Sequence, residues 1–307
     1  MNRRTFLKHT SILTTGSFLF AISDNNIFAS KLNRQNKVQK IPYLTLNNKV
    51  MMPCIGFGTL YLTGEKGIQC VADAIESGYR LIDTARIYGN EEEVGLGVKQ
   101  SGIERSKLFI TSKLWVDDAG YESTKKAFED TLNKLGTNYL DLYLIHRPRG
   151  DVRGSWKAME ELYRAGKIRA IGISNYEPEQ IKELQSYASI QPTVNQIETH
   201  AFYQESIQYD YLKRQKIVME AWSPFAQGRN GLFENATLNA IAVKHKRTVA
   251  QICLRWHFQR GVVAIPRTSQ KLHMQENIQI FDFKLDEDDL KAIATLDLDK
   301  TQFPEWT

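Results

Sequence analysis

Three short apolar runs of the chain end in titratable side chains, and a tyrosine follows the first of them closely. The runs are "LIDT", "FITSKL" and "LYLIHRP", which carry Asp83, Lys113 and His146 at or near their ends. Tyr88 stands five residues after Asp83. These side chains are acids and hydrogen-bond donors, and none of them is a serine or cysteine with an adjacent base. The set therefore points away from nucleophilic catalysis.

Together the four side chains could bind a carbonyl group and donate a proton to it. Tyrosine is a weak acid with an ordinary pKa of about 10, and a neighbouring ammonium group favours its phenolate. Lys113 could supply that ammonium, Asp83 could hold it in place, and His146 could hydrogen-bond the carbonyl oxygen. Reduction would also need a hydride, which side chains cannot supply, so the set predicts a nicotinamide cofactor.

Each of these residues alone has an ordinary structural interpretation. An aspartate at a strand end commonly caps a turn or helix, and an interior histidine is commonly a satisfied structural group. A single lysine or tyrosine is commonly part of the scaffold. The catalytic interpretation rests on the four occurring together at the ends of successive strands.

The elements that must position these residues alternate along the chain. A β-hairpin is predicted from Ile41, with its turn at Asn47 and Asn48, and strands and amphipathic helices follow it. Gly78, Gly136 and Gly166 stand where three of these helices should stop. Eight strands are predicted: Cys54–Thr59, Arg80–Thr84, Leu108–Lys113, Tyr139–His146, Ile168–Ser174, Thr193–Glu198, Ile217–Ser223 and Val262–Arg267.

Eight strands alternating with helices predict an α/β fold, a (β/α)8 TIM barrel with an N-terminal β-hairpin, over residues 41–307. In such a barrel the chemistry gathers at the carboxyl ends of the strands, where these four residues stand. The alternative is an open doubly wound sheet, which would want a GxGxxG turn after an early strand. "GFGTLY" lacks the third glycine, which disfavours that alternative.

Composition narrows the functional classes. The 307 residues carry a formal charge of +5, dispersed along the chain, which argues against a nucleic-acid partner. The 3 cysteines form no CxxC, and no HxH or similar cluster suggests a metal site. Each cysteine is expected to be a small buried apolar residue.

Residues 1–30 have the features of an export segment. Arg3 and Arg4 precede "TFLK", and the uncharged run from Thr10 to Ala21 is too short for a membrane span of roughly 20 residues. The segment resembles a twin-arginine signal, which predicts export machinery as a partner and a periplasmic location. A cytoplasmic form, or an uncleaved form tethered at the inner membrane, is the alternative.

Several motifs together resemble the aldo-keto reductases from about Ile41 to Trp306. They are "GFGT", "DTARIYGNE", "TSKLW", "IHRP", "IGISNY", "NQIE", "EAWSPFAQG" and "IPRTSQKLHMQENI". The sequence is most similar to small bacterial members of the 2,5-diketo-D-gluconate reductase type. The resemblance implies that Tyr88 is the general acid, helped by Lys113 and Asp83, and that His146 orients the carbonyl.

The resemblance also implies a site for NADP(H), and it implies that no metal is used, as in the family. Ser174, Asn175 and Gln196 would hold the nicotinamide carboxamide, and Trp222 would stack on the nicotinamide face. Arg267 and Thr268 match residues that face the 2′-phosphate. The other matching cofactor positions are Thr59, Ser223, Phe225, His273, Glu276 and Asn277.

The chain departs from the family pattern at two positions. His273 stands where an arginine is usual, which predicts weaker preference for NADPH and some use of NADH. Arg147 stands where tryptophan is usual, which predicts preference for polar or anionic substrates unless the side chain points to solvent. Tyr61, Trp115 and Trp222 are expected to form aromatic walls, and Trp306 to close the pocket if the tail folds over it.

The sequence thus predicts a monomeric oxidoreductase that reduces aldehydes, ketones or keto-sugars with NAD(P)H. A cofactor-binding sensor or regulatory module on the same barrel is the alternative from another class. A barrel hydrolase or lyase is disfavoured, because the sequence offers neither metal ligands nor a paired set of carboxylates.

Overall fold

A computed structural model describes residues 40–306, which form the predicted hairpin and barrel. The hairpin pairs β1 (Tyr43–Thr45) with β2 (Met51–Pro53) in antiparallel register, Leu44 opposite Met52. Its turn lies at Asn47 and Asn48, as predicted, and both amides donate to backbone carbonyls of the barrel, those of Pro192 and Arg169, at 2.9 Å. The expected export segment, residues 1–30, lies outside the described residues.

The eight predicted strands are present and pair in parallel, each with its neighbours in the sequence. The first and last strands meet through a parallel bridge between Ile55 and Ala264, which closes the barrel. Their bounds are β3 Phe57–Gly58, β4 Leu81–Asp83, β5 Phe109–Leu114, β6 Leu140–Ile145, β7 Ile168–Ser174, β8 Val194–Glu198, β9 Val218–Trp222 and β10 Val263–Ala264.

Strands β3 and β10 are shorter than predicted, although backbone contacts continue beyond them. The amide of Gly58 donates to the carbonyl of Pro266 at 3.0 Å, and that of Gly56 donates to Ala264 at 2.9 Å. Pro266 has no N–H of its own to continue the ladder, so regular pairing stops before it.

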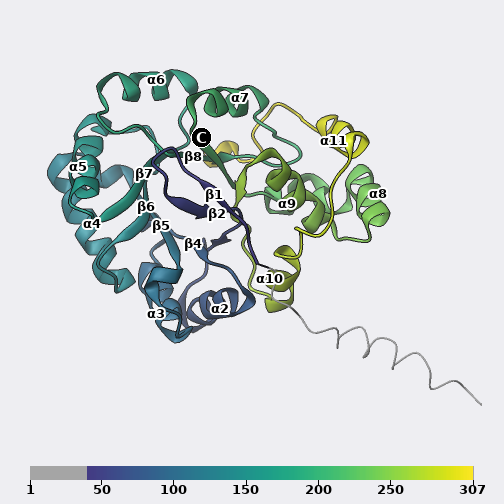
Figure 1. Cartoon of the computed structure of the whole chain (residues 1–307), viewed down its shortest axis with the longest axis horizontal. Helices are drawn as coiled ribbons and strands as arrows, with labels where there is room; N and C mark the ends of the chain where they lie inside the picture. The colour runs from purple at the N-terminus through teal and green to yellow at the C-terminus, as the bar shows by residue number, and fades with distance from the viewer. Residues whose placement is uncertain (1–39, 307) are drawn as a thin grey trace, which may run out of the picture. The chain divides into compact units, whose positions relative to one another are not determined.

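Helices surround the strands, as Figure 1 shows. Gly78 and Gly136 end two of them with φ of 118° and 62°, as predicted. Their bounds are α2 Gly64–Ser77, α3 Glu91–Gln100, α4 Tyr121–Leu135, α5 Val152–Arg164, α6 Pro178–Tyr187, α7 Ser206–Gln215, α8 Ala236–His245, α9 Val249–Arg260, α10 Lys271–Asn277 and α11 Glu287–Ala294. Short 3-10 helices are η1 Arg86–Tyr88, η2 Arg105–Lys107, η3 Val116–Asp118, η4 Ala226–Glu234 and η5 Pro304–Trp306.

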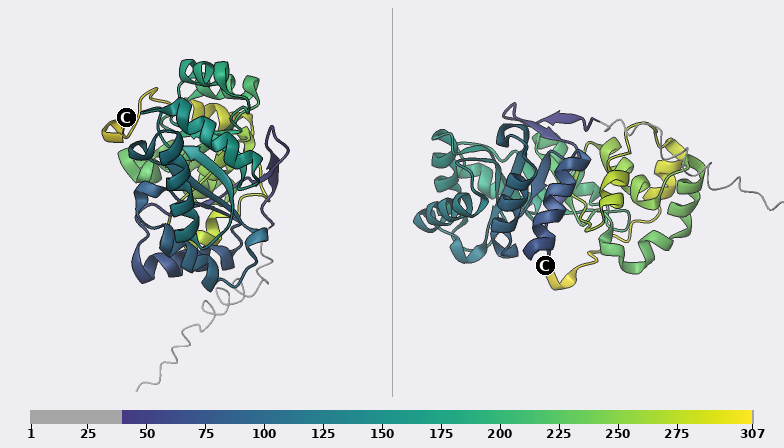
Figure 2. Two further views of the ribbon diagram at one scale, coloured as in Figure 1. Left: turned by 90° about the vertical axis from the view of Figure 1, so that its left-hand side faces the viewer. Right: turned by 90° about the horizontal axis from the view of Figure 1, so that it is seen from below.

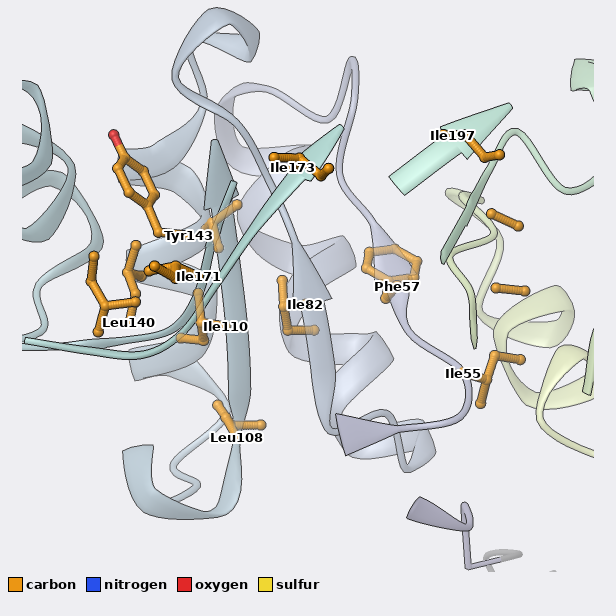
Figure 3. Packing of buried hydrophobic residues seen from close by; sticks show 14 of the residues in the cluster. Ile55, Phe57, Ile82, Leu108, Ile110, Leu140, Tyr143, Ile171, Ile173 and Ile197 are labelled. Atoms are coloured by element: carbon orange, nitrogen blue, oxygen red, sulfur yellow. The ribbon is translucent and has the colours of Figure 1, made fainter. Parts of the chain in front are cut away.

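The core has two layers because successive side chains of a strand face opposite sides. One set, including Ile82, Ile110 and Tyr143, packs outward against the helices, and Figure 3 shows part of this cluster. The other set fills the barrel with residues such as Leu81, Phe109 and Val194. The hairpin adds Leu46 and Met52 to this inner cluster, so it closes one end of the barrel.

The hairpin and the C-terminal segment lie at opposite ends of the barrel, as both views of Figure 2 show. Because the hairpin seals the amino ends of the strands, the carboxyl ends are left for a site. Among residues 40–306, no helix is long and apolar enough to cross a bilayer. Cys70 and Cys253 are buried, Cys54 is half-buried, and all three are unpaired thiols.

Candidate active site

Strand alternation turns the predicted catalytic residues into the barrel. Asp83 lies two residues after Leu81, and Lys113 lies four residues after Phe109, so each shares the inward face of its strand. His146 follows β6 directly. Tyr88 ends η1, in the loop after β4. The four side chains therefore meet at the carboxyl ends of the strands.

The geometry of this cluster matches the sequence prediction. Lys113 Nζ lies 2.6 Å from Asp83 Oδ1 and donates to the backbone carbonyl of Thr84 at 2.9 Å. The same ammonium donates to the Tyr88 hydroxyl at 3.4 Å. Asp83 and Lys113 are fully buried, so their ion pair is shielded from water. The lysine is thereby fixed with its charge beside the phenol.

The acid strength of Tyr88 differs from the sequence prediction. Burial raises the pKa of Tyr88, and this outweighs the Lys113 charge, which lowers it as expected. The net pKa lies above the ordinary value because the phenolate loses hydration in this cluster. Tyr88 therefore carries its proton across the neutral pH range, and Lys113 limits the cost of releasing it.

His146 is held as a neutral ring beside the phenol. Burial and the positive charges of Lys113 and Arg147 lower the pKa of His146 well below its ordinary value. Its ring lies edge-on to Tyr88, with centroids 6.0 Å apart, and edge-on to Trp115 at 5.2 Å. A neutral imidazole in this position can donate a hydrogen bond to a carbonyl oxygen that also contacts Tyr88.

A buried asparagine fixes the loop that carries Tyr88. Asn90 Nδ2 donates to the backbone carbonyls of Thr59 and Leu62 at 2.7 and 2.9 Å. Its Oδ1 accepts from the Thr84 hydroxyl at 2.9 Å. Asn90 thus ties the end of β4, the segment after β3 and the start of α3 together around the phenol.

The three residues expected to hold an amide group are adjacent. Asn175 Nδ2 donates to Ser174 Oγ at 2.9 Å, and Ser174 Oγ donates to the backbone carbonyl of Gln196 at 2.7 Å. Asn175 has a φ of 61°, and its Oδ1 accepts from the Trp222 indole at 2.9 Å. Asn175 is therefore positioned by the ring expected to lie against the nicotinamide.

A cavity of about 650 Å³ opens above the cluster. Most of the predicted site residues line it: Thr59, Tyr61, Asp83, Tyr88, Trp115, His146, Arg147, Asn175, Gln196, Trp222, Ser223, Phe225 and Arg267. Lys113 and Ser174 lie beneath this lining. Thr268, His273, Glu276 and Asn277 do not line it, because they belong to the segment after β10 and to α10. His273 and Glu276 are exposed, and Asn277 is buried.

The C-terminal segment folds over the cavity, as the sequence allowed. Trp306 lines the cavity, stacks on Phe303 and lies 5.6 Å from the Trp222 ring, centroid to centroid. Glu198 at the end of β8 anchors this segment by accepting from the Thr301 hydroxyl and from the amide of Gln302. Trp306 therefore closes one side of the pocket.

The lining carries groups suited to a ligand that has both an amide and a phosphate. Gln196 has a side-chain carbonyl oxygen that accepts no hydrogen bond from the described residues, and it lies beside Asn175 and Ser174. Arg267, which also lines the cavity, is exposed and has a guanidinium without an ion pair in residues 40–306. Arginine is well suited to phosphate. These groups match the ends of NADP(H).

Comparison with known proteins identifies the family. The model of the Aldo/keto reductase family matches residues 54–298. The chain belongs to this family. It is 48% identical over 261 residues to a glyoxal reductase of Bacillus subtilis, covering 84% of this chain and 94% of that protein.

Solved structures of aldo-keto reductases match the whole barrel. One from a Medee basin deep-sea metagenome library superposes with a TM-score of 0.82 at 42% identity, covering 85% of this chain and 97% of that one. An aldo-keto reductase of Bombyx mori in complex with NADP superposes with a TM-score of 0.82 at 32% identity, covering 87% and 97%.

Sequence reasoning missed several residues of this aldo-keto reductase site. Ile87, Gln227 and Phe233 line the cavity from η1 and η4, and nothing in their types marks them. Glu220 lies fully buried beneath Gln196. The sequence does carry a signal for Glu220, because it is a charged residue within the otherwise apolar run of β9, two positions before Trp222.

Proposed function

We propose that this aldo-keto reductase reduces small aldehydes, including α-oxo aldehydes such as glyoxal, and keto-sugars, with NADP(H) as its cofactor. The observation that carries the assignment is the Tyr88 hydroxyl, which lines the cavity and lies 3.4 Å from the ammonium of Lys113. The similarity to a glyoxal reductase supports the α-oxo aldehyde class. Keto-sugars such as 2,5-diketo-D-gluconate are the second substrate class that we propose.

The side chains have distinct roles in the reaction. Tyr88 and neutral His146 donate hydrogen bonds to the carbonyl oxygen, which polarises the carbonyl bond. NADPH would supply a hydride to the carbonyl carbon. The Tyr88 proton passes to the oxygen, giving the alcohol, and the resulting phenolate is stabilised by the Lys113 ammonium that Asp83 holds. The fully buried ion pair is in place before the reaction, so little reorganisation is needed.

Replacing the acid tests this function. Tyr88→Phe is expected to lower kcat by about 10²- to 10⁴-fold, the usual contribution of general acid catalysis. NADPH oxidation with glyoxal gives the rate, and quenching of protein fluorescence gives NADPH affinity. The control is Tyr43→Phe in the exposed part of the hairpin, at the other end of the barrel.

Two outcomes would contradict the assignment. Equal turnover in wild type and Tyr88→Phe would mean that another group is the acid. Tight NADPH binding by wild type with no turnover across a panel of aldehydes, ketones and keto-sugars would favour a sensor or regulatory module.

We propose that Arg147 makes the enzyme prefer anionic substrates. It lines the cavity beside His146, and none of the described residues forms an ion pair with its guanidinium. Burial, with the nearby charge of Arg149, lowers the pKa of Arg147, which is the mark of a cation partly removed from water without a counterion. A substrate carboxylate near the mouth would supply that counterion.

Comparing an anionic with a neutral substrate tests this preference. Arg147→Gln is expected to lower kcat/KM for glyoxylate by about tenfold, equivalent to about 1.4 kcal/mol, and to change the value for glyoxal much less. Arg149→Gln is the matched control, because Arg149 is exposed and does not line the cavity. Equal losses for both substrates would show that Arg147 does not select by charge.

The N-terminal segment supports a proposal about location. We infer from Arg3, Arg4 and the uncharged run after them that residues 1–30 direct export by the twin-arginine route to the periplasm. Cell fractionation with an antibody tests this, and Arg3→Lys with Arg4→Lys is expected to leave the protein in the cytosol. Finding all wild-type protein in the cytosol would contradict it.

We further propose that the protein is a monomer, which size-exclusion chromatography with light scattering would check.

A further inference from the structure

A second buried carboxyl group lies beneath the catalytic cluster. Glu220 stands on β9 directly opposite Gln196 of β8 in the parallel register. Its neighbour at position 222 lines the cavity, so strand alternation turns Glu220 to the same inward face, one layer deeper. Glu220 is fully buried. The proposed reaction does not use Glu220.

One amide joins this carboxyl group to the catalytic aspartate. Gln196 Nε2 donates to Asp83 Oδ2 at 2.8 Å and to Glu220 Oε2 at 2.8 Å. Both N–H bonds of the Gln196 amide are therefore used by carboxyl groups, one on β4 across the barrel and one on the neighbouring strand β9. The amide cannot rotate by half a turn without placing its oxygen against two carboxyl oxygens. Its carbonyl oxygen is thereby left for the cavity, where a carboxamide N–H would be the matching donor.

The charges in this layer do not balance when both carboxyl groups are ionised. The titratable groups facing Glu220 are Asp83 from β4, Lys113 from β5 and Tyr88 from η1. On its own sheet, β8 contributes the neutral Gln196, and β10 pairs the apolar Val263 beside it. One buried ammonium would thus face two buried carboxylates, which is costly.

The proton belongs on Glu220 rather than Asp83. Asp83 has Lys113 at 2.6 Å, whereas Glu220 has no cation within ion-pair distance in the described residues. The other oxygen of Glu220, Oε1, is buried and accepts or donates no hydrogen bond within residues 40–306. Burial, reinforced by the Asp83 charge, raises the pKa of Glu220 to about 8. The neutral form therefore predominates at neutral pH, with its proton on Oε1.

We propose that Glu220 is a positioning residue for the carbonyl reduction, which holds the Gln196 amide in one orientation and, by losing its proton, weakens Tyr88 as an acid. This proposal rests on the proposed function. In the neutral form Glu220 leaves the Asp83–Lys113 pair balanced. Once ionised, it adds a negative charge that disfavours the Tyr88 phenolate and so raises the pKa of Tyr88. The chemical step should then slow as the pH rises through the titration of Glu220.

The pH dependence of kcat distinguishes this role. In wild type, kcat for glyoxal reduction should fall by about threefold or more as Glu220 ionises, the effect of raising the pKa of an acid by about half a unit or more. Glu220→Gln keeps an acceptor for Gln196 Nε2 but cannot ionise, so its profile should lack this step. A Glu220→Gln profile that keeps the step would overturn the proposal.

Glu91 offers a matched control. It too is a buried carboxyl group with one oxygen lacking a hydrogen bond, and burial raises the pKa of Glu91. It accepts from Ser112 on the outward face of β5, away from the catalytic layer. Glu91→Gln should therefore keep the wild-type pH profile. If it loses the step as Glu220→Gln does, the effect is not specific to the catalytic layer and the proposal fails.

Cofactor binding tests the orienting role without turnover. Glu220→Leu leaves one Gln196 N–H without its acceptor, so the dissociation constant for NADPH should rise by about fivefold or more, as for a lost hydrogen bond of about 1 kcal/mol. Glu220→Gln should restore most of the affinity. Equal affinity in wild type and Glu220→Leu would show that Gln196 needs no such support.

Thermal unfolding provides a measurement that is independent of activity. A carboxyl group whose folded pKa is raised stabilises the fold at low pH and loses this contribution as the pH rises toward the folded pKa. The Tm of wild type should therefore fall relative to that of Glu220→Gln from about pH 5 to about pH 8. A constant difference would show that Glu220 does not titrate in this range. If wild type reduces no carbonyl compound, the proposed function fails, while the NADPH and Tm measurements still decide on Glu220.

Discussion

At the scale of single residues, the site depends on balancing charges that are out of contact with water. The Lys113 ammonium faces Asp83 at 2.6 Å and the Tyr88 hydroxyl at 3.4 Å. Burial raises the pKa of Tyr88 and the lysine charge opposes it. In the proposed reaction, the phenol therefore stays protonated until a substrate oxygen accepts its proton, while the stabilising charge is already in place.

Cofactor preference is also decided by individual side chains. Arg267 lines the cavity, and its guanidinium has no ion pair in the part of the chain described. His273 lies on α10 and is exposed. A second arginine would add a planar fork of donors for the 2′-phosphate, and histidine offers no such fork. We therefore expect the enzyme to favour NADPH over NADH by less than about 100-fold in kcat/KM.

Removing Arg267 should abolish most of the preference for NADPH over NADH. Arg267→Ala is expected to raise the KM for NADPH by about tenfold and to leave that for NADH nearly unchanged, because only NADPH carries the 2′-phosphate. Lys271→Ala is the control, since its ammonium already pairs with Asp73 and Glu76. A wild-type preference of about 100-fold or more would show that His273 does not weaken discrimination.

At the scale of elements, the strands set which way the site side chains point, and the loops set where the remaining site residues lie. Alternation along β4 and β5 turns Asp83 and Lys113 into the barrel without special contacts. Tyr88 lies on a short 3-10 helix and needs further support, which Asn90 gives by bonding three backbone or side-chain groups around it. We therefore expect stability and catalysis to be coupled at this loop.

Replacing Asn90 should affect both properties. Asn90→Ala removes the side-chain donor from the Leu62 carbonyl and the acceptor from the buried Thr84 hydroxyl, whereas the Thr59 carbonyl keeps its bond from the Leu62 amide. The loss should cost about 2–4 kcal/mol of unfolding free energy. The kcat should also fall, because Tyr88 loses its fixed position. Urea unfolding measures the first effect and NADPH oxidation the second. In Asn239→Ala, an exposed asparagine that also donates to two backbone carbonyls is removed, and a much smaller loss is expected.

At the scale of the whole molecule, the two ends of the barrel are closed by different parts of the chain. Leu46 and Met52 of the hairpin join the inner core at one end. At the other end Trp306 borders the cavity, held by contacts with Phe303 and Trp222. The end covered by the hairpin is thus filled by packed core residues, and the end beside Trp306 holds the cavity.

Acid sensitivity is a property of the whole fold. Burial lowers the pKa of His257 on α9 well below its ordinary value, with the charges of Arg260 and His200 adding to this. A histidine with a depressed folded pKa stabilises the fold above its unfolded pKa of about 6.5 and loses that contribution as the pH falls. One such group contributes a slope of up to about 1.4 kcal/mol per pH unit.

The difference between wild type and a His257 variant isolates this slope. Burial raises the pKa of Glu205 to about 7 and that of Glu220 to about 8, and both act in the opposite direction. Relative to His257→Phe, wild type should lose unfolding free energy as the pH falls below about 6.5. Parallel curves for wild type and His257→Phe would contradict the prediction.

The sequence by itself determined the order of elements and the family motifs, and it predicted four catalytic residues, whose side chains the structure brings together. These follow from local patterns: strand alternation, glycine stops and polar residues at strand ends. Only the tertiary structure decided the net pKa direction of Tyr88, the bridge from Asp83 through Gln196 to Glu220, and the position of Trp306 over the cavity. Desolvation and contacts across the barrel join residues that are far apart in the sequence, such as Asp83 and Gln196 at 113 positions, and no local pattern records them.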